Sequence, residues 1–160
     1  MSSAAEALQS TLSERIAARD RSGAVTAALD AVRAGSVTLP ELYDILAAHL
    51  IAVGSSWQSG ETEVWQEHYA TAVVRTIVEA CHPLAAEQAA APNGLSVVFA
   101  TPPEEYHDLG LRMIADRFTL AGWTAHLLGG NVPVDELIAA VSALGARAVV
   151  LSAYTHFHRL

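Results

Sequence analysis

The chain has 160 residues, of which 52% are apolar, so it can bury the core of one ordinary domain or of two small ones. Nine basic residues stand against seventeen acidic ones, and a net charge of -8 without a basic run argues against direct nucleic-acid binding. The single Cys81 excludes an internal disulfide and a cysteine-based zinc site. No signal peptide or membrane-spanning run is visible, so we expect a cytoplasmic protein that does not contact membranes.

Residues 1–88 follow a helical rhythm, with apolar side chains recurring every three to four positions. Thr38 and Glu41 form a capping-box pattern that predicts the start of the third helix, and Gly54 is expected to end it. Pro83 is expected to end the fourth helix. Four helices with short connections predict a four-helix bundle. The predicted helices span residues 4–20, 22–34, 38–53 and 61–81.

Residues 89–160 follow a different rhythm, in which short β-branched runs alternate with helical segments. Strand-helix-strand-helix-strand predicts the start of a Rossmann-like domain with a parallel sheet. Such domains carry about five strands, so we expect this one to be partial and truncated after its third strand. The five predicted elements span residues 95–100, 105–121, 123–128, 133–144 and 148–152.

The loop after the first predicted strand carries a histidine, His107, with Glu105 before it and Gly110 after it. In an open parallel sheet, ligands bind beyond the carboxyl ends of the strands. An imidazole there can reach a ligand through one nitrogen while a carboxylate holds the other. The alternative is an exposed histidine at a helix start whose acidic residues suit the helix dipole.

A second group of candidate residues lies in the helical half. Trp57 is placed just past the third predicted helix, and Glu67 and His68 lie about two turns into the fourth. These offsets can bring the indole and the Glu-His pair toward one opening. The alternatives are a Trp57 in the core and a solvated helix face for the other two, whereas Trp65 is predicted to be a core residue.

Taken together, the two groups resemble a known family. Residues 105–110 are similar to the cobalamin-binding signature Asp/Glu-x-His-x-x-Gly. Residues 57–68, a tryptophan followed after nine residues by Glu-His, resemble the signature of adenosylcobalamin-dependent photoreceptors of the CarH type. The order of a four-helix cap before a Rossmann-like domain is also similar, and residues 128–133 resemble the Leu-Gly-Ala-Asn-Val-Pro of those sensors.

The resemblance implies a role for each matched residue of the second half. His107 would be the lower axial ligand of cobalt, and Glu105 would orient its imidazole. Gly110 would let the nucleotide tail of the cofactor pass close to the backbone. Gly129 would line the slot for that tail, and Ser152 would contact its buried base.

In the helical half, the resemblance implies that Trp57, Glu67 and His68 enclose the 5′-deoxyadenosyl group of adenosylcobalamin. Photolysis of the cobalt–carbon bond would then drive a conformational signal, without enzymatic activity. Gln58 stands where these sensors often have a histidine that binds cobalt after illumination. This difference argues against a light state with two histidine ligands through that position.

The resemblance leaves the output of the chain open. No helix-turn-helix domain resembling that of CarH is recognised, so the signal is expected to reach a partner or an output domain, either transcriptional or photosensory. Self-association through the helical cap is a further expectation. Two alternatives remain: a corrinoid carrier protein of a methyltransferase system, and an interaction module without a cofactor.

Overall fold

The computed structural model describes residues 2–153 of the chain. This part divides into two compact units that meet in sequence between Pro83 and Leu84. A helical region with four helices is followed by a parallel sheet with helices, which confirms the predicted fold class. The elements are α1 (Ser3–Ala17), α2 (Arg21–Arg33), α3 (Leu39–Gln58), α4 (Val64–Glu87), β1 (Ser96–Ala100), α5 (Leu109–Leu120), β2 (Thr124–Gly129), α6 (Val134–Ala143) and β3 (Ala148–Leu151).

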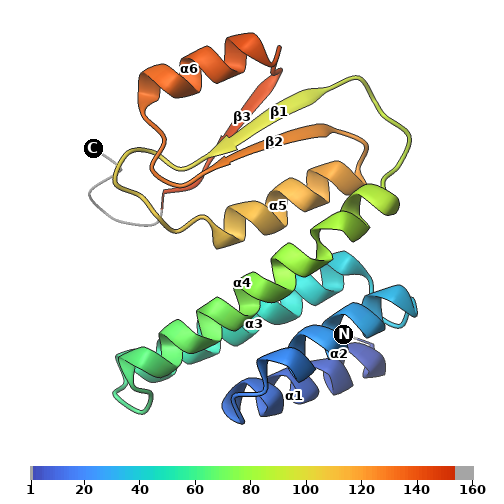
Figure 1. The fold of residues 1–160 in the computed structure, drawn as a ribbon, viewed down its shortest axis with the longest axis vertical. Coiled ribbons are helices and arrows are strands. Elements are labelled where there is room, and N and C mark those ends of the chain that lie inside the picture. The colour runs from blue at the N-terminus through green and yellow to red at the C-terminus, as the bar shows by residue number, and fades with distance from the viewer. Residues whose placement is uncertain (1, 154–160) are drawn as a thin grey trace. The chain divides into compact units, whose positions relative to one another are not determined.

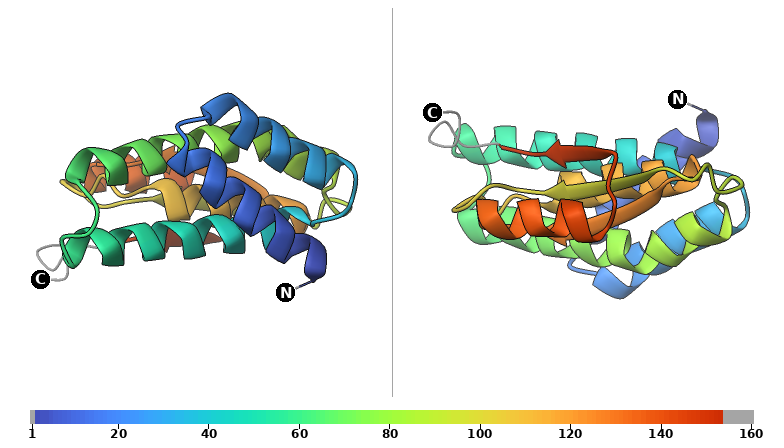
Figure 2. Two further views of the ribbon diagram at one scale, coloured as in Figure 1. Left: turned by 90° about the horizontal axis from the view of Figure 1, so that it is seen from below. Right: turned by 90° about the horizontal axis from the view of Figure 1, so that it is seen from above.

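The helical unit packs around one apolar core. Helix α1 contacts both α2 and α3, and Figure 2 shows it running between them. The buried side chains of each helix recur every three to four positions, which places them on one face. The largest of these apolar side chains are Leu8, Leu12 and Ile16 in α1 and Leu39, Leu42, Tyr43, Ile45 and Leu46 in α3.

Helix α3 begins as predicted but ends later. The hydroxyl of Thr38 accepts the N–H of Glu41 at 3.3 Å, and the Glu41 carboxylate accepts the N–H of Thr38 at 2.8 Å, which completes the capping box. The prediction that Gly54 ends the helix is wrong, because α3 continues to Gln58. A glycine inside a helix costs only about 1 kcal/mol relative to alanine, so the flanking residues carry the helix through it.

Helix α4 also departs from its predicted bounds. It begins at Val64 and contains Pro83 within it, whereas the prediction started it near residue 61 and ended it before that proline. Proline removes one helical hydrogen bond, yet the backbone remains helical to Glu87, and Leu84, directly after the proline, is buried. Residues 84–87 therefore extend the helix by a further turn.

The sheet contains three parallel strands in the order β2-β1-β3, so β1 is the central strand. Its central residue Val98 aligns with His126 of β2 and with Val149 of β3. Figure 1 shows α5 and α6 on opposite faces of the sheet. The crossover through α5 runs from β1 to β2, and the crossover through α6 runs back from β2 past β1 to β3. Because the two cross the sheet in opposite directions, right-handed connections place their helices on opposite faces. Val97 and Phe99 of β1 are fully buried.

The loop after β1 carries the candidate residues Glu105 and His107. Helix α5 begins at Leu109, four residues later than predicted, so residues 101–108 form a loop after β1. Asp108 precedes the helix without forming a side-chain cap. Within residues 2–153, no helix has the length and apolar character needed to cross a bilayer.

Candidate functional site

The loop after β1 places a buried carboxylate beside an exposed imidazole. The side chain of Glu105 is 1% exposed and that of His107 is 64% exposed. Glu105 Oε1 lies 2.6 Å from His107 Nδ1 and also accepts the backbone N–H of His107 at 2.9 Å. Because one oxygen contacts both groups of the same residue, the carboxylate fixes the orientation of the ring.

This contact determines which ring nitrogen can bind a metal. An ionised carboxylate only accepts hydrogen bonds, so Nδ1 of His107 carries the proton. In the neutral ring the lone pair for a metal is then on Nε2. Among residues 2–153, no three histidine, cysteine, aspartate or glutamate side chains gather as a metal site. The pair itself offers one nitrogen to a metal.

The Glu105–His107 pair lies where the strand order reverses. Strand β2 pairs with one edge of β1, and β3, which follows β2 in the chain, pairs with the other edge. In doubly wound sheets, ligands bind in the crevice at this switch point. Ser152, the first residue after β3, donates its N–H to the carbonyl of Ala100 at 3.2 Å. The end of β3 is thus held beside the start of the His107 loop.

The two candidate glycines border this region in different ways. Gly129, the last residue of β2, has φ +89°, a conformation that favours glycine. A β-carbon there would lie 3.6 Å from the carboxylate of Asp108, which forms an ion pair with Arg112 at 3.0 Å. A β-carbon at Gly110, in the first turn of α5, would meet no atom of the described chain within 4 Å. Gly110 therefore borders open space that a ligand can approach.

The candidate residues of the helical unit lie at the end of α3 and the start of α4. Glu67 Oε2 lies 2.7 Å from His68 Nδ1, and Glu67 Oε1 accepts the hydroxyl of Thr71 at 2.9 Å. Trp57 lies in the last turn of α3, not past it as predicted, because the helix extends to Gln58. It is 46% exposed, so the alternative that Trp57 is a core residue is wrong.

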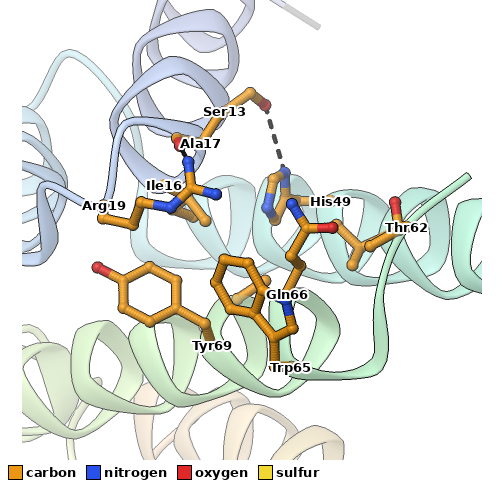
Figure 3. Close-up of a pocket in the computed structure, with 11 residues that line it drawn as sticks. Ser13, Ile16, Ala17, Arg19, His49, Thr62, Trp65, Gln66 and Tyr69 are labelled. Carbon is orange, nitrogen blue, oxygen red and sulfur yellow. Dashed lines mark hydrogen bonds between the residues drawn. The ribbon is translucent and has the colours of Figure 1, made fainter.

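A pocket of about 220 Å³ lies between α1, α3 and the start of α4, within the helical unit (Figure 3). Its lining includes Trp65, which the sequence predicted to be a core residue. That prediction is wrong, because Trp65 is 55% exposed and the guanidinium of Arg19 lies 5.2 Å from its ring centre. A cation held over an indole face lets a large aromatic side chain remain at the surface. None of the eight candidate residues lines this pocket.

The partly buried side chain of His49 makes the free energy of unfolding of the helical unit depend on pH. Its Nδ1 is hydrogen-bonded to the Ser13 hydroxyl at 3.3 Å, its Nε2 is buried without a partner among residues 2–153, and burial lowers its pKa from 6.5. The unfolded chain therefore binds the proton more readily. We expect the free energy of unfolding to fall as the pH drops through 6.5 toward the lower folded pKa. One proton sets a slope of at most about 1.4 kcal/mol per pH unit.

Urea unfolding at several pH values between about 5 and 7.5 measures this slope. His49→Gln keeps a polar side chain that does not titrate, so the variant should lose the part of the slope due to His49. Identical slopes for the two proteins would show that the buried imidazole does not set the acid sensitivity.

Two residues that the sequence analysis missed, Thr101 and Asn131, also contact the His107 loop. The N–H of Asn131 lies 2.9 Å from Thr101 Oγ1 and 2.8 Å from the carbonyl oxygen of Glu105. Asn131 has φ +57°, and an asparagine directly after two glycines at a strand end is a sequence signal for such a turn. Its pairing with Thr101, 30 positions earlier, has no local signal.

Comparison with known proteins finds a matching family for part of each unit. Residues 95–159 match a family described as B12 binding domain, and residues 8–82 match a second family with the same description. The HTH-type transcriptional repressor CarH of Myxococcus xanthus is 38% identical over 131 residues, which make up 80% of this chain and 42% of CarH. The chain thus spans less than half the length of that relative.

Among solved structures, the monomethylamine corrinoid protein of Methanosarcina barkeri is similar in fold, with a TM-score of 0.75. The match covers 92% of this chain and 70% of that protein. At 18% sequence identity, this likeness shows a shared architecture.

Proposed function

We propose that this chain, whose two units match B12-binding domain families and form a cobalamin-binding module, senses light through adenosylcobalamin. The observation that carries the proposal is the Glu105–His107 pair at the switch point of the sheet. It supplies a single oriented nitrogen that would hold the cobalt of a bound cobalamin. The identity to CarH and the paired sequence signatures support the adenosyl form.

On the lower side, His107 would bind cobalt through Nε2 while Glu105 holds Nδ1. The surrounding residues fit a cofactor with a bulky tail. Gly110 leaves open space at the start of α5, and Gly129 keeps the end of β2 free of a side chain. Ser152, held at the end of β3, would contact the base of the tail. These residues would bind and orient the cofactor and exclude water from its lower face.

On the upper side, Trp57, Glu67 and His68 would enclose the adenosyl group. An indole offers a flat apolar wall for a purine, and a carboxylate accepts hydrogen bonds from ribose hydroxyls. Bound adenosylcobalamin supplies a cobalt–carbon bond that visible light cleaves. The contacts of these three side chains would exist only while the adenosyl group is present. That difference is what a two-state switch requires.

The signal would act on a partner or an output domain, without catalysis by this chain. The relative CarH is a transcriptional repressor, and the chain covers 42% of it. We therefore propose a regulatory output, with self-association of the helical unit as one way to transmit the change.

An absorbance spectrum with adenosylcobalamin in darkness, repeated after green light, tests the proposal. We expect retained cofactor with a histidine-ligated spectrum that changes irreversibly on illumination. Trp57→Ala should weaken retention of the adenosyl form by at least about tenfold, because it removes a large aromatic anchor. Trp65→Ala, which removes a similarly exposed indole from the same unit, is the matched control and should leave retention unchanged.

Other outcomes separate the alternatives. Retention of methylcobalamin or hydroxocobalamin but not of the adenosyl form would identify a corrinoid carrier. A protein that retains no cobalamin at all would contradict the proposal.

A further inference from the structure

Hydrogen bonds join the loop after β1 to the loop after β2. We call the four residues that make these bonds the clasp: Thr101, Glu104, Glu105 and Asn131. Figure 1 shows both loops at the same end of the sheet. The hydroxyl of Thr101 donates to the carbonyl oxygen of Glu105, and the N–H of Asn131 reaches the same oxygen at 2.8 Å. A carbonyl oxygen has two lone pairs, so these two donors can saturate it. Thr101 is fully buried, which shields its hydrogen bond to Glu105 from water.

Asn131 holds the His107 loop at a second point. Its side-chain Oδ1 accepts the N–H of Glu104 at 2.8 Å. Both residues have positive φ, +57° for Asn131 and +67° for Glu104, and asparagine tolerates this conformation better than most residues. A β-carbon at the preceding Gly130 would lie 3.4 Å from the Glu105 carbonyl oxygen and from Tyr106 Cα, so the two loops are closely packed.

The clasp therefore acts on the residue whose carboxylate orients His107. With its carbonyl held by Thr101 and Asn131, the backbone of Glu105 has little freedom to move its side chain away from Nδ1. We infer that Asn131 and Thr101 are positioning residues that keep the His107 imidazole aligned for a metal. This inference rests on the proposed function, in which His107 is the lower ligand of cobalt.

Four variants separate the contributions of the clasp. Asn131→Gly keeps the positive φ and the backbone N–H but removes Oδ1, whereas Asn131→Asp keeps an acceptor oxygen. Thr101→Val removes the hydroxyl at nearly constant shape, whereas Thr101→Ser keeps it. Asn93→Gly is the matched control. The Asn93 side chain accepts the N–H of Leu95 in its own loop and donates to the carbonyl of Ala121 in another loop, and these residues precede the amino ends of β1 and β2.

The first measurement is amide hydrogen exchange by NMR in the cobalamin-free protein. We expect the N–H groups of Glu105 and His107 to exchange about fivefold faster in Asn131→Gly and Thr101→Val, as the loss of one hydrogen bond implies. The conservative variants Asn131→Asp and Thr101→Ser should restore slow exchange, and Asn93→Gly should leave these two amides unchanged. Unchanged exchange in both Asn131→Gly and Thr101→Val would overturn the inference. If one of these two variants fails to fold, the exchange rates of the other test the inference.

The second measurement is the fraction of bound adenosylcobalamin in the histidine-ligated form, in darkness. We expect Asn131→Gly and Thr101→Val to lower the ratio of the histidine-ligated to the unligated form about fivefold at equal total binding, a change that a loss of global stability alone would not produce. An unchanged fraction in both variants, with cobalamin bound by the unmodified protein, would overturn the inference and leave the proposed function intact. If the unmodified protein binds no cobalamin, the proposed function fails and with it the metal-positioning role.

Discussion

Replacing His107 with alanine should abolish the histidine-ligated spectrum of bound cobalamin. The imidazole is the exposed member of the Glu105–His107 pair, and the Glu105 carboxylate holds its Nδ1 at 2.6 Å. Cobalamin bound to the variant would lack a protein nitrogen on its lower side. Absorbance spectra of the two proteins at equal cobalamin occupancy measure the loss.

Two controls make this result specific. His82→Ala removes another exposed histidine, far in sequence from the β1 loop, and should keep the ligated spectrum. His107→Gly should lose the spectrum and regain it when free imidazole is added, because the small ligand can occupy the vacated space. A ligated spectrum that persists in His107→Ala would show that another group binds cobalt and would contradict our assignment.

Replacing Glu105 with glutamine is expected to weaken histidine ligation without removing the ligand. The glutamine keeps the shape of a side chain that is 1% exposed but loses the negative charge that holds the proton on Nδ1. Loss of such a partner typically costs about 10- to 100-fold in metal affinity. Titration of the variant with cobalamin, followed at the wavelengths of the ligated form, measures this factor.

Glu104→Gln is the matched control for this experiment. Glu104 is the preceding residue and is exposed, and its link to Asn131 runs through the backbone, which the substitution leaves in place. It should retain the affinity of the unmodified protein. Equal affinities for Glu105→Gln and the unmodified protein would mean that the buried charge does not tune His107.

Local sequence patterns predicted most of the helices and strands. The predicted helix ends were wrong where the surrounding residues together favoured the helix more than one glycine or proline opposed it. The capping box of Thr38 and Glu41 is a contact between near neighbours, so the start of α3 could be read directly. Gly54 and Pro83 are helix-ending residues on average, yet both lie inside helices here. The free energy of a long helix depends on all its residues and their packing, which a single position does not reveal.

In the candidate site, too, contacts between near neighbours could be predicted from the sequence and contacts between distant segments could not. Glu105 and His107 are two positions apart, so their contact was open to prediction from spacing. The burial of Glu105 and the bonds from Asn131 depend on how β2 is placed beside β1, and this pairing joins segments about 30 positions apart. Trp65 was misjudged because an arginine above its ring stabilises it at the surface, a contact between residues 46 positions apart.

The position of β1 at the centre of the sheet has a consequence for the order of folding. Val98 pairs with His126, 28 positions later, and with Val149, 51 positions later. Closing the longer segment first costs about 0.5 kcal/mol more in chain entropy, and β3 leaves a synthesising ribosome last. We therefore expect β1 and β2 to associate before β3 joins them. The Glu105–His107 pair and Asn131 would already be assembled in such a two-stranded intermediate, and Ser152 would complete the crevice afterwards.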